Sequence, residues 1–199
     1  MEAETGALAG IRIVDLTDER AIYGAKLLAD LGAQVVRPEP PGGDPLRRRG
    51  PLTSTDASLW HGFFASNRTF VPMEAGQLAE LAASADVLLS CGGKFAGADV
   101  DLGALREANP ALVVIDTTSL DKEGPWADFC APDLIAGALG GAVATTGDVD
   151  TPPLKCFGEL NFMVAGAYVA IAALAGLAAA RRDGAGQQID VSVHECLVS

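Results

Sequence analysis

The sequence predicts an α/β protein built on a Rossmann-like parallel sheet with helices on both faces. Two observations support this fold class. Short apolar segments alternate with helical segments of about ten residues along the chain, an order typical of parallel βαβ units. The apolar segments are rich in Val, Ile and Leu, as expected of strands covered on both sides. We therefore interpret residues 1–199 as a single α/β domain.

The elements follow from local composition. The first strand is apolar and β-branched, and the first helix is rich in Ala and Leu. Later elements are separated by Gly, Pro and Asp residues, which favour turns. In chain order we expect strands at 11–16, 34–37, 86–89, 112–117 and 188–193, and helices at 22–31, 59–65, 76–83, 102–108, 133–139 and 161–181.

Residues 38–51 are predicted to form a loop because they contain five prolines and three glycines. The run Arg47-Arg48-Arg49 lies near the end of this segment. We expect the loop to cross the surface above the carboxyl ends of the strands.

Residues 162–180 contain no charged side chain, and a segment of this length can span a bilayer. A helix at the centre of a packed domain is also apolar on all sides. Gly166, Ala173 and Gly176 would let neighbouring backbone approach this segment closely. We therefore expect a buried core helix and no membrane partner.

The protein is acidic. Its 14 Lys and Arg residues stand against 26 Asp and Glu residues, which gives a formal net charge of −12. Such a surface repels phosphate backbones and anionic bilayers. We therefore expect no nucleic-acid partner.

The cysteines and histidines favour a reduced protein without a metal. The four cysteines are widely spaced, with no Cys-x-x-Cys pair, and no signal-like apolar stretch follows the first Met. We expect a cytoplasmic location on these grounds. His61 and His194 are the only histidines and stand far apart in the sequence, which argues against a zinc site or a Ser-His-Asp triad.

The segment after the first strand argues against the usual dinucleotide-binding mode. Residues 17–24 lack a glycine-rich phosphate cradle and carry two carboxylates where a pyrophosphate would lie. The sequence also has no Walker-type loop and no Gly-x-Ser-x-Gly elbow. We therefore expect no NAD.

Several sequence blocks in a fixed order carry a resemblance to a known family. They include Gly42-Gly43-Asp44-Pro45 and Gly184-Ala185-Gly186-Gln187, within the blocks 8–16, 27–45, 85–89, 105–110, 124–128, 145–153 and 184–193. Their order resembles the family III CoA-transferases, the group of carnitine CoA-transferase, formyl-CoA transferase and α-methylacyl-CoA racemase. The resemblance implies the Rossmann-like large domain of that family. It also implies CoA transfer between carboxylic acids, with acyl-CoA as a substrate.

The resemblance also suggests candidate site residues. It implies a nucleophilic Asp just before the helix at 161–181, which forms carboxylate-bound intermediates with acyl-CoA. The ungapped position holds Phe162, and the nearest carboxylate is Glu159, which is therefore the candidate catalytic residue. Arg37, at the family's basic position at the end of the second strand, and Arg68, in place of a family Lys, are the candidate CoA-binding residues.

Two segments depart from the family pattern in regions where its members hold CoA. Residues 20–22 replace an Ala-Gly-Pro turn, and residues 90–95 replace a Glu-Asn-Phe-x-Pro-Gly loop. A catalytically degenerate paralogue, acting as a structural or regulatory partner of a full-length member, is therefore the alternative to an active enzyme. Racemase or isomerase chemistry also stays open, because one fold serves several reactions.

The resemblance covers only the N-terminal half of family members, whose chains continue well beyond the last block. The long apolar helix and the sheet edge would then leave apolar surface uncovered, and such surface usually marks an interface. We expect a homo-oligomer, or a hetero-complex with a chain that supplies the C-terminal half, as in a split enzyme.

Overall fold

The computed structural model describes residues 6–74, 76–127 and 129–198. Its centre is a six-stranded sheet in which all neighbouring strands run parallel, in the order β3-β2-β1-β4-β7-β8. This is the doubly wound order, in which the direction of growth reverses between β1 and β4. The predicted Rossmann-like fold class is therefore confirmed. The strands are β1 (Arg12–Asp15), β2 (Gln34–Glu39), β3 (Arg68–Pro72), β4 (Val87–Ser90), β7 (Val113–Thr118) and β8 (Gln188–Ser192).

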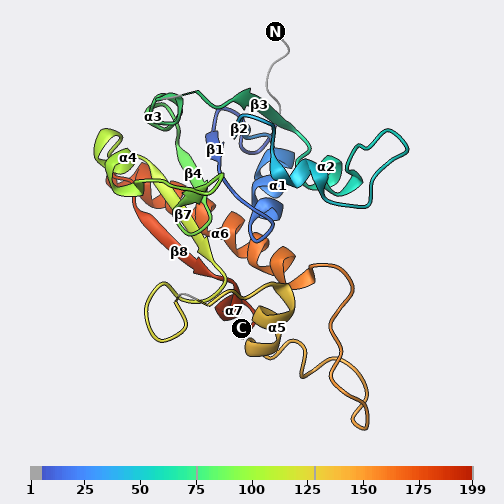
Figure 1. Cartoon of the computed structure of the whole chain (residues 1–199). Helices are drawn as coiled ribbons and strands as arrows, with labels where there is room; N and C mark the ends of the chain where they lie inside the picture. The colour runs from blue at the N-terminus through green and yellow to red at the C-terminus, as the bar shows by residue number, and fades with distance from the viewer. Residues whose placement is uncertain (1–5, 75, 128, 199) are drawn as a thin grey trace.

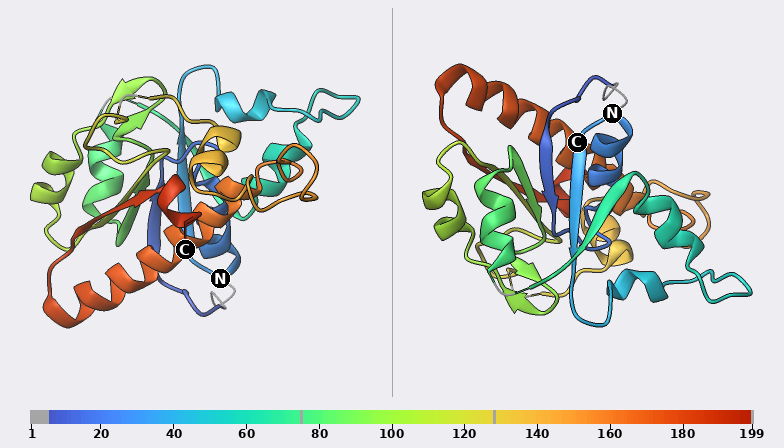
Figure 2. Two further views of the ribbon diagram at one scale, coloured as in Figure 1. Left: turned by 90° about the horizontal axis from the view of Figure 1, so that it is seen from below. Right: turned by 90° about the horizontal axis from the view of Figure 1, so that it is seen from above.

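Helices cover both faces of the sheet (Figures 1 and 2). Successive side chains of a strand point to opposite faces, so Ile13 belongs to one hydrophobic core and Val14 to the other. The first core is completed by α1 (Ile22–Asp30) and α6 (Leu160–Asp183), and the second by α3 (Gln77–Ala83) and α4 (Leu102–Ala108).

Glycines let α6 approach its neighbours at backbone distance. A Cβ atom on Gly24 of α1 would lie 2.5 Å from the carbonyl oxygen of Gly166, and one on Gly166 would lie 2.8 Å from the nitrogen of Gly24. Further along α6, a Cβ atom on Gly176 would lie 2.5 Å from Cγ1 of Val113 in β7. Only glycine fits at Gly24 and Gly166 without a shift of the backbone, and a Cβ atom on Gly176 would displace the Val113 side chain.

Within the described residues, α6 is the helix that is long and apolar enough to span a membrane, with a mean hydropathy of 2.1 over an 18-residue window. In the structure 44% of that window is buried. The buried side faces α1 and β7, whereas Tyr168, Ile171 and Leu174 are exposed on the outer side. The packing of α6 is that of a core helix with one uncovered apolar face.

The structure differs from the sequence prediction in several places. The predicted loop at 38–51 is partly wrong, because β2 extends to Glu39 and a 3-10 helix, η1, spans Pro45–Arg48. Asp44 begins this helix by accepting a hydrogen bond from the backbone N–H of Leu46. The edge strand β3 was not predicted from the sequence. The remaining elements are α2 (Leu59–Phe64), α5 (Asp133–Leu139), α7 (Val193–Cys196) and the hairpin of β5 (Lys94–Phe95) and β6 (Ala98–Asp99).

Replacing Gly166 by Ala should destabilise the protein, because the added methyl group meets the backbone of α1. We expect the free energy of unfolding to fall by about 1–3 kcal/mol, the range for overpacked cores, in urea denaturation. Gly62→Ala in α2 is the control, because no atom lies within 4 Å of a Cβ added there. Gly62→Ala should be neutral or stabilising by up to about 1 kcal/mol. Equal stability of Gly166→Ala and wild type would contradict the close packing of α1 on α6.

Candidate functional site

Two adjoining cavities open where the strand order reverses. Cavity 1 has a volume of about 750 Å³, and cavity 2 has a volume of about 290 Å³. They share a wall formed by residues 18–20 after β1 and by Cys91 and Lys94 after β4. Ligands of doubly wound proteins bind outside the carboxyl ends of the strands at this switch point. The fold therefore identifies these cavities as the candidate site.

The shared wall is charged. Arg20 donates hydrogen bonds from Nε and Nη2 to the Asp18 carboxylate, and Nη2 lies 2.5 Å from Oδ2. Burial alone would lower the pKa of Arg20, but the hydrogen bonds that Arg20 donates to Asp18 outweigh burial and raise the pKa. Burial raises the pKa of the Cys91 thiol, and the charge of Asp18 raises it further. Cys91 is therefore a neutral thiol in this wall, and Arg20 is a permanent cation already paired with a carboxylate.

A second charged group lies at the end of β7. Buried Asp116 accepts a hydrogen bond from the backbone N–H of Gly93 at 3.0 Å, and its Oδ2 lies 2.6 Å from Nζ of Lys122. Lys122 also pairs with Asp190, the register partner of Asp116 on β8. Burial would lower the pKa of Lys122, but the two carboxylates outweigh it and raise the pKa. One lysine is thus shared by two carboxylates beside cavity 1.

Much of the remaining wall of cavity 1 is apolar, and the hydroxyl side chains of Thr118 and Ser119 also line it. It includes Phe162, which is in the first turn of α6 and only 5% exposed. Phe129 also lines it and is well exposed. The apolar lining residues are Leu120, Ala127, Phe129, Ala131, Pro132 and Phe162.

The start of α6 is held by a buried carboxylate from α5. Asp133 Oδ1 accepts a hydrogen bond from the backbone N–H of Phe162 at 3.0 Å. Its Oδ2 accepts one from the side chain of Asn161 at 3.0 Å and lies 3.0 Å from Nζ of Lys155. A carboxylate at this position satisfies an unpaired helix N–H and complements the helix dipole. Asp133 therefore fixes the position of Phe162 in the cavity wall.

Glu159 precedes α6, but its side chain makes no capping hydrogen bond. Its carboxylate forms an ion pair with Arg49, whose guanidinium lies 4.5 Å from the ring centre of Trp60. Glu159 is not among the residues that line cavity 1 or cavity 2. The catalytic role of Glu159 stays a prediction, and it requires the ion pair with Arg49 to open.

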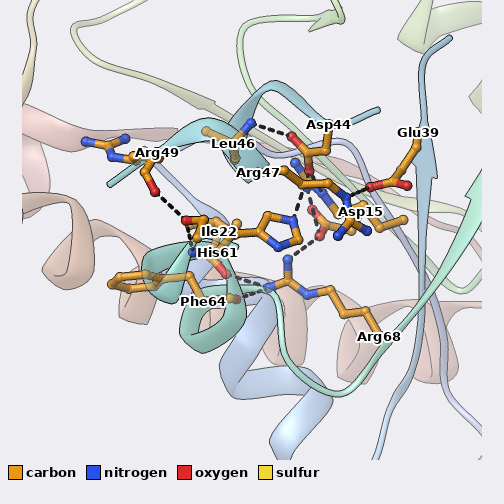
Figure 3. A network of polar contacts seen from close by, with 12 residues as sticks. Asp15, Ile22, Glu39, Asp44, Leu46, Arg47, Arg49, His61, Phe64 and Arg68 are labelled. Carbon is orange, nitrogen blue, oxygen red and sulfur yellow. Dashed lines mark hydrogen bonds and ion pairs between the residues drawn. The ribbon is translucent and has the colours of Figure 1, made fainter. Parts of the chain in front are cut away.

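Arg37 and Arg68 belong to one buried charge network that joins the first three strands. Figure 3 shows Asp15, Asp44 and Arg68 of this network. Asp15, the last residue of β1, has Oδ2 at 3.1 Å from Nη1 of Arg37 and at 2.8 Å from Nη1 of Arg68. Nε of Arg37 also lies 2.6 Å from Oδ2 of Asp44. Arg37 lines cavity 2, whereas Arg68 lines neither cavity and donates hydrogen bonds to backbone carbonyls instead. Their roles as CoA-binding residues stay predictions.

The network holds its carboxylates ionised. Burial would raise the pKa of Asp15, but the charges of Arg68 and Arg37 outweigh burial and lower it. Burial likewise opposes ionisation of Asp44, whereas the His61 ring, with Nε2 at 3.6 Å from Oδ2, and the hydrogen bond that Arg37 donates lower its pKa. Two Asp and two Arg side chains thus compensate one another away from water, as buried charges require.

One group of side chains has the composition of a metal site. Ligand atoms of Glu39, Asp44 and His61 lie within 4.8 Å of one another, a donor set that suits several transition metals. Both carboxylates already have a guanidinium partner, since Arg37 contacts Asp44 and Arg47 contacts Glu39 at 2.6 Å each. A divalent cation would have to displace Arg47 or add uncompensated charge to a buried network, so the observed pairing does not fit one.

Sequence reasoning located only part of this site. It singled out the turn after β1 and residues 90–95, and both line the cavities. It missed Asp116 and Lys122, although Asp116 could have been found from its position at the carboxyl end of a buried strand. Asp133 was also missed, because a cap supplied by another helix leaves no local pattern.

The fold and the cavities define an α/β protein with a ligand site at the switch point of a doubly wound sheet. A model of CoA-transferase family III matches residues 8–199, so the chain belongs to this family. Succinyl-CoA:(R)-benzylsuccinate CoA-transferase subunit BbsE of Thauera aromatica is 35% identical over 92% of this chain and 48% of its own. Succinate–glutarate CoA-transferase of Agrobacterium fabrum is 32% identical over 94% of this chain and 50% of its own.

Solved structures agree with this assignment. A CAIB/BAIF family protein from Brucella suis superposes with a TM-score of 0.87 at 25% identity, covering 97% of this chain and 55% of its own. The chain therefore spans about half the length of the relatives that it matches.

Asp15→Asn should be strongly destabilising, because it removes the charge that compensates Arg37 and Arg68. We expect a loss of about 3–5 kcal/mol in the free energy of unfolding at neutral pH, the range for breaking a buried pair. Asp183→Asn, which affects an exposed ion pair with Arg182, should leave the stability unchanged. A stable Asp15→Asn protein would show that the network does not hold the strand ends together.

The same network predicts a loss of stability in acid. The folded-state pKa of Asp15 lies below its ordinary value of 3.8. Its contribution is therefore fully present above about pH 5 and is lost as the pH falls through the ordinary value towards the folded-state pKa. Urea denaturation at a series of pH values should show this decline in the wild type and a weaker decline in Asp15→Asn. Parallel pH profiles for the two proteins would contradict the assignment to Asp15.

Proposed function

We propose that this protein binds an acyl-CoA thioester in cavities 1 and 2 and takes part in CoA transfer between carboxylic acids in the cytoplasm. The supporting observation is the position of the cavities at the carboxyl ends of β1 and β4 in a member of CoA-transferase family III. The relatives named above are CoA-transferases acting on acid pairs. All four cysteines are free, as suits a reducing compartment.

The cations around the cavities suggest how an anionic ligand is held. Lys94 lines both cavities, so it is placed to meet phosphate groups of CoA, whereas Arg20 adds positive potential to both cavities while it stays paired with Asp18. Arg37 adds positive potential from the wall of cavity 2 while its guanidinium stays paired with Asp15 and Asp44. Arg68, behind that wall, acts as a fixed charge instead of a direct phosphate ligand.

The proposed covalent chemistry uses Glu159. After the ion pair with Arg49 opens, the Glu159 carboxylate attacks the thioester carbonyl. The C–S bond breaks, the CoA thiolate departs, and a mixed anhydride between Glu159 and the acyl group remains. The thiolate then attacks the Glu159 carbonyl, which releases the donor acid and forms an enzyme-bound CoA thioester. Attack by the acceptor carboxylate and return of the thiolate give the new acyl-CoA and restore Glu159. The position of Glu159 at the start of α6 supports this role, because a helix N-terminus favours an anion.

A second candidate function is that of a catalytically degenerate paralogue which stabilises or regulates a full-length family member. The observation that favours it is the pairing of Glu159 with Arg49, together with an apolar Phe162 in the cavity wall. In that case the cavities would remain, but no carboxylate would form an intermediate with CoA.

We further propose that polypeptide outside residues 1–199, or a second copy of the chain, packs on the exposed apolar face of α5 and α6. Large apolar side chains on this face are unusually exposed, with Ile171 at 60%. Exposed surface of this kind commonly marks an interface. The exposed apolar side chains on these two helices are Leu134, Ile135, Leu139, Leu160, Tyr168, Ile171 and Leu174.

Glu159→Gln should abolish covalent trapping of CoA. The wild-type protein, incubated with acyl-CoA and quenched with hydroxylamine, should yield a hydroxamate at Glu159 that mass spectrometry detects. Glu107→Gln, on the exposed surface of α4, is the matched control and should still be trapped. CoA binding without any modification of Glu159 would favour the degenerate paralogue and contradict the catalytic proposal.

Sedimentation should detect self-association or capture of a partner through the α5 and α6 face. Ile171→Glu should shift the protein towards monomer without loss of helicity, because a charge in a buried interface is costly. Glu80→Gln, on exposed α3, should leave the distribution unchanged. A monodisperse wild-type monomer at micromolar concentration would contradict association of this chain with itself.

A further inference from the structure

We infer that the acyl group held in cavity 1 is apolar and carries no second carboxylate. The inference rests on the proposed binding of an acyl-CoA and adds the class of acyl group. It concerns the wall that Phe162 and Phe129 form with neighbouring apolar residues, facing a cavity of about 750 Å³.

The apolar wall can enclose a hydrocarbon body. It is formed by Leu120, Phe129, Ala131, Pro132 and Phe162, which come from the segment after β7 and from the start of α6. Asp133 holds Phe162 in place through its backbone N–H, so this part of the wall is fixed before a ligand binds. Each methylene that such a wall removes from water strengthens binding by about fourfold.

The charges of the cavity do not suit a second carboxylate. Three carboxylates, from Asp18, Glu19 and Asp116, line cavity 1 together with three cations, from Arg20, Lys94 and Lys122. Arg20 is occupied by Asp18, and Lys122 is shared by Asp116 and Asp190.

Lys94 lines both cavities, and in the proposed binding mode it meets the CoA phosphates. An extra carboxylate on the acyl group would displace an existing pair, or would lie beside three carboxylates with only the neutral hydroxyls of Thr118 and Ser119 left to bind it. Either result weakens binding.

This expectation differs from what the relatives' names indicate. Several of those proteins are named for dicarboxylates, among them succinate–glutarate and succinyl-CoA:mesaconate CoA-transferases. A preference for apolar acyl groups would therefore separate this protein from them by the chemistry of one cavity wall.

The test compares two CoA thioesters that differ only at the far end of a six-carbon acyl chain. Hexanoyl-CoA ends in a methyl group, and adipyl-CoA ends in a carboxylate. Calorimetric titration of the wild-type protein should show hexanoyl-CoA binding at least about tenfold more tightly than adipyl-CoA and more tightly than free CoA. Adipyl-CoA binding equally or more tightly would overturn the inference and leave the proposed function standing. Failure of free CoA and of both thioesters to bind would overturn both.

Two variants test whether the apolar wall of cavity 1 causes the preference for hexanoyl-CoA over adipyl-CoA. Phe129→Lys places a cation in cavity 1 at a position that is 61% exposed, so the fold should tolerate it. We expect the hexanoyl-to-adipyl affinity ratio to fall at least about fivefold, since the new charge compensates the second carboxylate. Phe157→Lys, at a fully exposed Phe that lines neither cavity, should keep the wild-type ratio. An unchanged ratio in Phe129→Lys would overturn the assignment to this wall.

Discussion

The structure around the site depends on the buried carboxylate of Asp15, which joins the carboxyl end of β1 to Arg37 of β2 and to Arg68, the first residue of β3. It ends β1, contacts arginines supplied by β2 and β3, and accepts hydrogen bonds from Thr17 at the start of the next turn. A charge with no solvent exposure is tolerated only where opposite charges surround it. The path of the chain from β1 into the shared cavity wall, and the placement of Arg37 in cavity 2, follow from that requirement.

This use of charge shapes the site. The protein has few basic residues, and several of those near the cavities are already engaged with carboxylates of the same chain. Such pairs preorganise the walls, but they leave little positive charge for a ligand. The proposed binding of CoA, a polyanion, would therefore depend on few side chains and on the shape of the cavities.

The sequence was sufficient to predict a parallel sheet and most of the helices, because the spacing of apolar residues along the chain indicates which side chains are buried. β3 was not predicted because it is an edge strand, and its polar residues Arg68 and Thr69 interrupt the apolar pattern expected of a strand. The candidate site was harder to predict. Lys122 meets Asp190 across 68 residues and Arg49 meets Glu159 across 110, so these pairings depend on strand register and loop path instead of local composition.

The contact between Gly24 and Gly166 has a mechanical consequence. α1 follows the charged turn of cavity 1, and α6 carries the apolar Phe162 of the same cavity in its first turn. Because the two helices touch through their backbones, these parts of the wall resist being spread apart by a larger molecule. Widening must come from the hairpin of β5 and β6 and from residues 119–127 and 129–132, which carry most of the other lining residues. Entry and release of a ligand are thus tied to one deformable side of the cavity.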